Sequence, residues 1–466
     1  MTTPPTATRL LQNRWIRIGL AALAAAVLFT GALNVRSAFQ DDVADDWAID
    51  PEAPSAIDGL IGRDAAARGG TPLGDLILGL QDALREDPDN GAAATQLGLA
   101  YLQQTRETGD PSYYPKAETL FTQALEEDDA DFAAMVGMGS LALARHDFAA
   151  ALTWGEQAHA VNPSHAPALG VIGDAQIELG RYDEAVVTFQ AMVDLRPDLA
   201  SYSRVSYARE LFGDRPGAII AMEQAAEAGA GRAENIAWTQ VQLGNLHAGG
   251  GDLATATRAY ETALRTLPGY VYALAGQGRV AAAQGDYSTA IAHYEAALTA
   301  MPLPEFAIAL GDVYTAAGDA AAAERTYALV EAIQALSVAN GVDLDLELAL
   351  FTVDHPERGQ DPATTLALAE AAYARRPGIH AADVLAWARF AAGDLNGAWS
   401  ASVEARRLGT KDALMAYHAG VIAGARGDTA AAQELLQTAL TLDPHFSLRY
   451  APDAQSRLTR LDAELG

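Results

Sequence analysis

The stretch VYALAGQGRVAAAQGDYSTAIAHYEAAL, residues 271–298, decides the fold of this chain. Its first half carries apolar residues at helical spacing, namely Val271, Leu274, Val280 and Ala281. Gly285 supplies the left-handed position that ends a helix, and Asp286 can cap the next helix. The second half repeats the helical spacing with Ile291, Tyr294, Ala297 and Leu298. We therefore predict a helix–turn–helix unit, which cannot bury its apolar face alone.

The turn phrase Gly-x-x-x-x-Ala, usually beginning Gly-Asp, returns along the chain. It begins at Gly180, Gly213, Gly251, Gly285, Gly318, Gly393 and Gly427. The successive spacings are 33, 38, 34, 33, 75 and 34 residues, and 75 corresponds to two repeats plus an insertion. A period of about 34 residues indicates a repeat architecture in which each unit packs on its neighbours.

These units resemble the tetratricopeptide repeat, whose pattern is W-x2-L-G-x2-Y, then A-x3-F, A and P. One unit carries Leu169, Ile172, Gly173, Ala185, Phe189 and Pro197, another Leu243, Gly244, Ala256, Tyr260, Ala263 and Pro268, and a third Leu310, Gly311, Tyr314, Ala323 and Tyr327. The resemblance spans about residues 75–446. It implies an all-α fold, a right-handed superhelical solenoid of about nine to ten helix-turn-helix repeats. No unit has the first-position Trp, and Trp238 lies two residues before that place.

The predicted solenoid occupies residues 72–447, and a polar capping helix follows within residues 448–466. The first full unit contains an insertion within RETGDPSYYPK, residues 106–116. The register loosens at about residues 330–378, where two counts that differ by one repeat both fit. There, ERTYALVEAIQALSVANG reads as one long second helix, and DLDLELALFTVDHP with DPATTLALAEAAYARRP reads as a degenerate pair.

The first forty residues differ from the rest of the chain. They hold four arginines and no acid, namely Arg9, Arg14, Arg17 and Arg36. Residues 18–35 form an uncharged run that spans about 27 Å as a helix, enough for a bilayer core. We predict a transmembrane anchor there, with residues 1–17 in the cytoplasm; the alternative is the apolar region of a cleaved signal peptide. Residues 36–71 are predicted to be a flexible acidic linker.

The composition and charge of the chain exclude several classes of function. The 466 residues include 31 basic and 60 acidic ones, a net charge of −29, which argues against nucleic-acid binding. The chain has no cysteine, so disulfides, thiolate zinc sites and cysteine nucleophiles are excluded. None of the nine histidines forms a His-x-x-x-His or His-Glu-x-x-His motif, and the glycine-rich turn at residues 249–252 lacks the context of a phosphate loop. We therefore predict no catalytic residues, no metal and no cofactor, so the chain is not expected to be an enzyme.

The remaining candidate site is the groove lined by the first helices of the repeats. The resemblance implies groove positions six and three residues before, and one and four residues after, the pattern Gly. The predicted partner-binding residues are Tyr207, Trp238, Asn245, Tyr272, Arg279, Asp312, His380, Asp383, Trp387, Phe390 and Tyr417. The alternative is that Trp238 and Trp387 pack between neighbouring repeats. Only Asn245 and Arg279 approximate the family's carboxylate clamp, so that activity is not carried over.

These predictions combine into one functional hypothesis. The chain resembles a membrane-tethered bacterial scaffold that binds protein partners in its groove during assembly or maturation at the cell envelope. The solenoid would lie on the outer side of the cytoplasmic membrane, or be exported after signal cleavage. A polysaccharide-binding or secretion-associated role at the envelope is the alternative, and homo-oligomerisation stays open.

Overall fold

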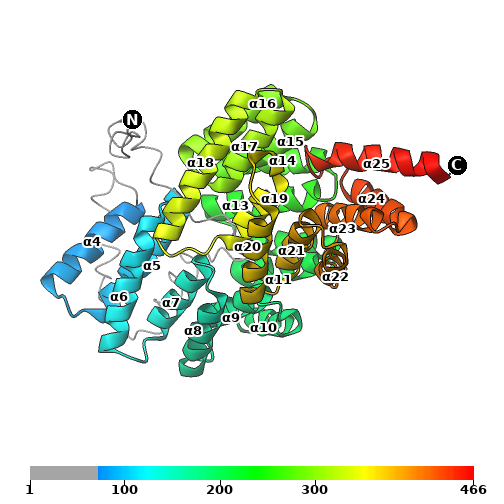
Figure 1. The fold of residues 1–466 in the computed structure, drawn as a ribbon. Coiled ribbons are helices and arrows are strands. Elements are labelled where there is room, and N and C mark those ends of the chain that lie inside the picture. Colours follow the sequence, from blue (N-terminus) through cyan, green and yellow to red (C-terminus); the bar gives the residue numbers. More distant parts are fainter. Residues whose placement is uncertain (1–71, 466) are drawn as a thin grey trace, which may run out of the picture. The chain divides into compact units, whose positions relative to one another are not determined.

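The computed structural model describes residues 72–465, where every regular element is helical. This part of the chain contains 22 α-helices and two 3-10 helices (Figure 1). The predicted basic N-terminus (1–17), anchor or signal segment (18–35) and linker (36–71) lie outside the described residues. Among the helices of residues 72–465, none combines the length and apolar content needed to cross a bilayer.

The helices follow one another with short turns. The first twelve in chain order are α4 Pro72–Glu86, α5 Gly91–Thr108, α6 Tyr114–Glu127, α7 Phe132–Ala144, α8 Phe148–Val161, α9 Ala166–Glu178, α10 Tyr182–Leu195, α11 Leu199–Leu211, α12 Arg215–Ala228, α13 Ala233–Ala248, α14 Leu253–Thr266 and α15 Val271–Ala283. The remaining ten are α16 Tyr287–Ala300, α17 Pro304–Ala316, α18 Ala320–Ala339, α19 Asp345–Asp354, α20 Pro362–Arg375, α21 Ile379–Ala391, α22 Leu395–Ala405, α23 Ala413–Ala425, α24 Thr429–Leu442 and α25 Tyr450–Leu465. The 3-10 helices are Pro111–Tyr113 and Pro356–Arg358.

The recurring phrase forms the turn between the two helices of a pair. Gly285 has a φ of +78°, and the Asp286 carboxylate accepts the Thr289 backbone N–H at 3.1 Å, as the sequence predicts. The same cap is made by Asp147, Asp214, Asp252, Asp319, Asp394 and Asp428. Before α8, His146 takes the glycine's place with a φ of +62°. The Gly-x-x-x-x-Ala phrase is therefore absent at this turn, although the backbone has the same left-handed conformation.

The pattern glycines of the first helices let an aromatic ring of the second helix approach the backbone. A Cβ at Gly244 would overlap the Tyr260 ring, and a Cβ at Gly311 would overlap the Tyr327 ring. Both tyrosines are buried. The pairs are therefore held by close contact between a glycine and a ring, which explains why small residues recur at these positions.

The described residues belong to two compact units. One unit includes α4 to α8, the first part of α9 up to Ala175, and residues 335–342. Its core contains Phe121, which packs against the backbones of Gly98 and Gly137 on successive first helices. Arg145 and Glu118 form an ion pair at 2.7 Å in this unit.

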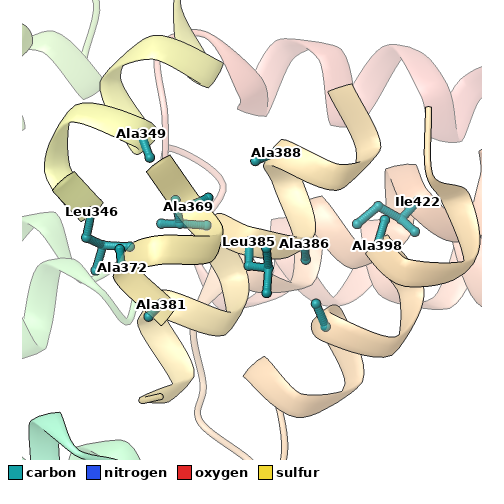
Figure 2. Packing of buried hydrophobic residues seen from close by; sticks show 12 residues of the cluster. Leu346, Ala349, Ala369, Ala372, Ala381, Leu385, Ala386, Ala388, Ala398 and Ile422 are labelled. Carbon is teal, nitrogen blue, oxygen red and sulfur yellow. The ribbon is translucent and has the colours of Figure 1, made fainter. Parts of the chain in front are cut away.

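The other unit comprises residues 176–334 and 343–466. First helices of successive pairs contact each other in it: α13 with α15, α15 with α17, and α21 with α23. One of its core clusters is built mostly from alanine, as Figure 2 shows for α19 to α23. The members are Leu346, Ala349, Ala369, Ala372, Ala381, Val384, Leu385, Ala386, Ala388, Ala398, Ala401 and Ile422. Alanine allows helices to approach closely, so a chain with few aromatics still fills its interior.

Within this second unit, loops of the C-terminal repeats (residues 377–465) pack on the turns of the central repeats (residues 176–316). The Tyr182 hydroxyl accepts the buried Ile379 N–H at 2.7 Å. Arg407 donates to the Gly180 carbonyl at 3.0 Å and stacks on the Tyr182 ring. We call this set, and its equivalents one repeat further on, the turn contacts.

The next repeat makes the equivalent turn contacts. Arg215 donates to the Lys411 carbonyl at 2.8 Å, and the Thr410 hydroxyl donates to the Leu211 carbonyl. The threonine thereby satisfies a carbonyl at the end of α11 that the helix itself leaves unpaired. The partners in these two hydrogen bonds are 196 and 199 residues apart in the sequence. The second unit thus brings distant parts of the chain into contact.

The loosely repeated region also has defined helices. The long second helix is α18, and the degenerate pair is α19 with α20. The final helix begins at Tyr450, within the predicted range of residues 448–466. This start follows from Ser447, whose hydroxyl accepts the backbone N–H groups of Arg449 and Tyr450 at 3.2 Å each. Solenoid handedness stays a prediction.

Candidate functional site

The predicted groove residues of the central repeats lie on the first helices α11, α13, α15 and α17. Trp238 and Tyr272 occupy equivalent positions on α13 and α15, 34 residues apart, and both are half-buried. Trp238 packs against the core around Leu243 and Leu246. The Tyr272 ring meets Phe306 edge-on at 5.9 Å. Two aromatic rings therefore lie on neighbouring helices without being fully enclosed.

The polar residue that directly follows the pattern Gly forms a hydrogen bond within its own helix pair. The Tyr260 hydroxyl donates to Asn245 at 2.8 Å, and the Tyr327 hydroxyl donates to Asp312 at 2.7 Å. In both cases a tyrosine of the second helix bonds a polar residue of the first helix. Burial raises the pKa of Tyr260 to about 12, so this tyrosine is a permanent donor at neutral pH. Asn245 and Asp312 thus hold helix pairs together.

Arg279 links α15 to the C-terminal repeats. Its guanidinium lies 3.4 Å from Asp443, whose side chain is only 3% exposed, whereas the arginine side chain is 42% exposed. Tyr207, one of the predicted residues on α11, packs partly buried against the cluster of Leu211 and Met415. Both residues therefore contribute to the packing of the C-terminal repeats on the central ones.

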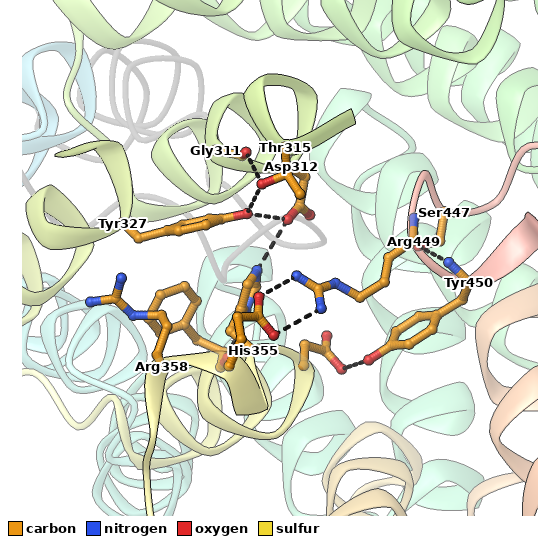
Figure 3. A network of polar contacts seen from close by, with 12 residues as sticks. Gly311, Asp312, Thr315, Tyr327, His355, Arg358, Ser447, Arg449 and Tyr450 are labelled. Carbon is orange, nitrogen blue, oxygen red and sulfur yellow. Dashed lines mark hydrogen bonds and ion pairs between the residues drawn. The ribbon is translucent and has the colours of Figure 1, made fainter. Parts of the chain in front are cut away.

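Asp312 also takes part in a larger network, shown in Figure 3. His355 contacts Asp312 through Nε2 at 3.0 Å and the Phe351 carbonyl through Nδ1 at 2.8 Å. The Tyr327 ring packs on His355 at 4.6 Å. His355 is 2% exposed and the Asp312 side chain is 30% exposed, so the imidazole is enclosed while the carboxylate keeps part of its surface.

The network continues beside α25. Arg449 forms a bidentate ion pair with Glu357 at 2.7 and 3.1 Å, and the Tyr450 hydroxyl donates to Asp354 at 2.8 Å (Figure 3). The charge of Glu357 and its hydrogen bonds help raise the pKa of Arg449 despite partial burial. An ion pair and a hydrogen bond therefore fix the start of the final helix to the end of α19 and to the 3-10 helix that follows it.

Three predicted residues of the C-terminal repeats form one aromatic cluster. Trp387, Phe390 and Tyr417 come together with His418 and Tyr450. Trp387 stacks on His418 at 4.3 Å and is 7% exposed, and Tyr417 is 2% exposed. Trp387 and Tyr417 lie in the interior of the C-terminal repeats, as the packing alternative for Trp387 describes, whereas Phe390 is half-buried. Their role in partner binding stays a prediction.

Asp383 and His380 behave differently although both lie in the first turns of α21. Asp383 is buried and its carboxylate lies 2.9 Å from Nδ1 of the fully buried His418. Burial alone would lower the pKa of His418, but the charges of Asp383 and Asp354 and the hydrogen bond raise it. His380 is exposed. Of the predicted residues, His380 is thus exposed, and those that keep part of their surface are Tyr207, Trp238, Asn245, Tyr272, Arg279, Asp312 and Phe390.

The partners of these residues were not among the predicted site residues. They are Asp354, His355, Asp443 and Tyr450, which reach the predicted positions across 33 to 164 residues. One local signal was available: a tyrosine stands fifteen residues after Asn245 and after Asp312, and it makes the same bond in both repeats. Within residues 72–465, no group of three or more His, Asp or Glu side chains is arranged to hold a metal ion.

Comparisons with known proteins agree with the repeat pattern. Profiles of the tetratricopeptide repeat match residues 112–165, 142–208, 241–303 and 276–337. The chain therefore contains tetratricopeptide repeats in both units, a class of repeat that generally serves protein interaction. No curated protein matches the chain.

Solved structures with similar helices include the APC/C hetero-tetramer Cut9–Hcn1, at 15% identity over 87% of this chain and 86% of that chain, with a TM-score of 0.40. A thermophilic tetratricopeptide repeat protein of Thermus thermophilus matches at 22% identity over 41% and 97%, with a TM-score of 0.36. A tetratricopeptide repeat protein from Parabacteroides merdae matches at 16% identity over 59% and 98%, with a TM-score of 0.40.

Proposed function

We propose that this tetratricopeptide repeat chain is a membrane-tethered scaffold that holds a protein partner on the first helices of its central repeats. The supporting observation is the pair of half-buried rings, Trp238 and Tyr272, at equivalent positions on contacting helices α13 and α15. Half-exposed aromatic side chains anchor protein interfaces because they bury a large apolar area at little entropic cost. We call this surface the first-helix face.

The chemistry around these rings favours a peptide segment as the ligand. The Tyr272 hydroxyl already faces Met301, at 3.8 Å from its sulfur, so the ring offers mainly apolar surface. A partner helix or extended segment could place an apolar side chain against each ring, at the spacing of neighbouring helices of about 8–10 Å. The repeats would supply specificity through the residues around the rings.

The tether belongs to the proposal as well. An uncharged run of 18 residues preceded by three arginines supports an anchor whose repeats lie on the outer side of a cytoplasmic membrane. Anchoring confines the scaffold and a membrane or exported partner to the same surface, which raises their effective concentration. The step it would assist is assembly or maturation at the cell envelope.

Paired substitutions test the first-helix face. Trp238→Ala with Tyr272→Ala is expected to lower partner capture at least about tenfold, as loss of two aromatic anchors does. Arg279 is left unchanged because it pairs with Asp443. The matched control is Trp154→Ala with Tyr287→Ala, which removes similar rings from second helices α8 and α16. Capture would be measured by crosslinking the tagged full chain in intact cells, with circular dichroism as the folding check.

Each outcome has a defined meaning. Loss of capture in the first variant alone supports the proposal, whereas equal capture by both variants contradicts it. An envelope polysaccharide was the alternative ligand from sequence; captured glycan in place of protein would establish that role. Recovery of the chain in the soluble fraction after membrane separation would contradict the tether and leave the test of the face intact.

A further inference from the structure

A second surface lies on the outer side of α22, away from the residues discussed so far. Trp399 and Val403 stand four residues apart on one side of this helix, and Arg406 directly follows its last residue. Val403 is 49% exposed, which is high for a large apolar side chain. Trp399 is partly buried against the alanine-rich core. The result is a surface on which one apolar side chain and part of an indole meet solvent.

Two guanidinium groups converge on this indole. The Cζ atom of Arg426, at the end of α23, lies 5.1 Å from the centre of the Trp399 ring, and that of Arg406 lies 5.7 Å from it. Both distances fall in the range of cation–π attraction. The tryptophan thus restricts the conformations of both arginine side chains. A ligand would therefore lose less affinity to ordering these side chains when it binds.

Neither guanidinium forms an ion pair within residues 72–465. Arg406 donates from Nε to the Ser402 carbonyl at 3.1 Å, and only longer-range attraction from Asp383 and Glu434 reaches it. Other arginines of the same unit, such as Arg358, contact carboxylates directly. Arg406 and Arg426 therefore share one indole and contact no carboxylate directly, which leaves both guanidiniums available to an acidic ligand.

The local charge supports this contrast. Residues 399–426 contain four basic and two acidic residues, although the whole chain carries a net charge of −29. Asp383 and Glu434 attract Arg406, whereas salt at physiological strength screens acidic residues farther away than about 8 Å, so the rest of the acidic chain repels a ligand here only weakly. A nucleic acid is disfavoured, because its long phosphate backbone would also meet the acidic remainder of the chain.

We propose that Trp399, Val403, Arg406 and Arg426 bind an acidic segment of a protein partner in which an apolar side chain stands beside the carboxylates. The two guanidiniums would hold carboxylates through charge-assisted hydrogen bonds, and Val403 with the indole would accept the apolar side chain. This surface is separate from the first-helix face, so it adds a second recognition element and does not depend on the first.

A defined peptide tests the proposal. The probe is a fluorescein-labelled 12-residue peptide with the repeated sequence Glu-Leu-Glu-Glu-Leu-Phe, and its counterpart carries Gln in place of every Glu. Fluorescence anisotropy with the purified full chain is expected to show binding of the acidic peptide, and at least tenfold weaker binding of the Gln peptide. Raising NaCl from about 50 to 500 mM is expected to weaken the acidic peptide several-fold.

Matched variants locate the site. Arg406→Gln with Arg426→Gln is expected to weaken the acidic peptide about tenfold, the effect of losing two exposed ion pairs. The control, Arg258→Gln with Arg325→Gln, removes the same charge from exposed arginines on α14 and α18 and is expected to bind as the unmodified chain does. Circular dichroism confirms folding of each variant.

The Trp238→Ala with Tyr272→Ala variant separates the two surfaces, because it is expected to bind the acidic peptide normally. Absence of binding, equal binding of the acidic and Gln peptides, or equal loss in the two arginine variants would each overturn the proposal.

Discussion

The same turn phrase serves two different purposes in the second unit. Gly213 and Gly427 both have left-handed backbones, with φ of +76° and +83°, and an Asp cap follows each. A Cβ at Gly213 would overlap the Gly409 carbonyl oxygen, whereas a Cβ at Gly427 would meet nothing within 4 Å. One turn is covered by the C-terminal repeats and the other is open.

The difference between these two turns shows that a turn glycine can meet a local requirement, its backbone conformation, and a long-range one, the approach of another backbone. Every turn needs a residue that tolerates positive φ, and His146 shows that a non-glycine residue can meet this need. Only the covered turns also need the absence of a side chain, because another backbone approaches them. The turn contacts therefore fix how the C-terminal repeats pack on the central repeats within the second unit.

The largest expected effect comes from filling a covered turn. Gly213→Ala should lower the free energy of unfolding by about 3 kcal/mol, since the left-handed backbone costs about 1–2 kcal/mol and the overlap with Gly409 adds to it. Gly427→Ala should cost about 1 kcal/mol, because only the backbone term applies. Urea denaturation followed by circular dichroism measures both. Equal losses would show that covering adds nothing to the turn.

A smaller effect is expected from one turn contact. Tyr182→Phe removes the acceptor of the buried Ile379 N–H and should cost about 2 kcal/mol, the penalty for an unsatisfied buried donor. Tyr287→Phe removes the hydroxyl of a half-buried tyrosine on an open second helix, so it should change stability by less than about 0.5 kcal/mol. The same denaturation series compares them. A neutral Tyr182→Phe would mean that water satisfies this N–H.

The smallest expected effect concerns a buried carboxylate of the central repeats. Glu305 lies in the first turn of α17; burial, and then the charge of Glu347, raises its pKa to about 8. The folded state therefore holds this proton more strongly than the unfolded state, so its contribution to stability is lost as pH rises from about 4.5 through 8. Glu305→Gln should be roughly neutral at pH 5 and stabilise by about 1 kcal/mol at pH 8.5.

Thermal unfolding at both pH values measures this prediction. The control is Glu223→Gln on the exposed side of α12, which should show no such pH dependence. A stability difference for Glu305→Gln that stays the same at pH 5 and pH 8.5 would contradict the buried-carboxylate account.

Local sequence was enough to predict the turns and much of the helical pairing. Gly285 and Asp286 act as expected because their conformational preferences are set by neighbouring residues. The burial of Trp387 and Tyr417 could not be predicted from local sequence in the same way. Their burial depends on α19 and α25, and hence on the small rotation between successive repeats summed over many units. A repeat pattern contains no direct signal for that sum.

The most direct test of the proposed scaffold is site-specific photo-crosslinking in intact cells. A photo-activatable residue would replace Tyr272 on the first-helix face or, as control, Tyr287 on a second helix, and adducts would be identified by mass spectrometry after membrane fractionation. We predict a recurrent protein adduct in the membrane fraction from position 272 and not from position 287. The same adduct from both positions, or self-adducts in the soluble fraction alone, would contradict the scaffold proposal.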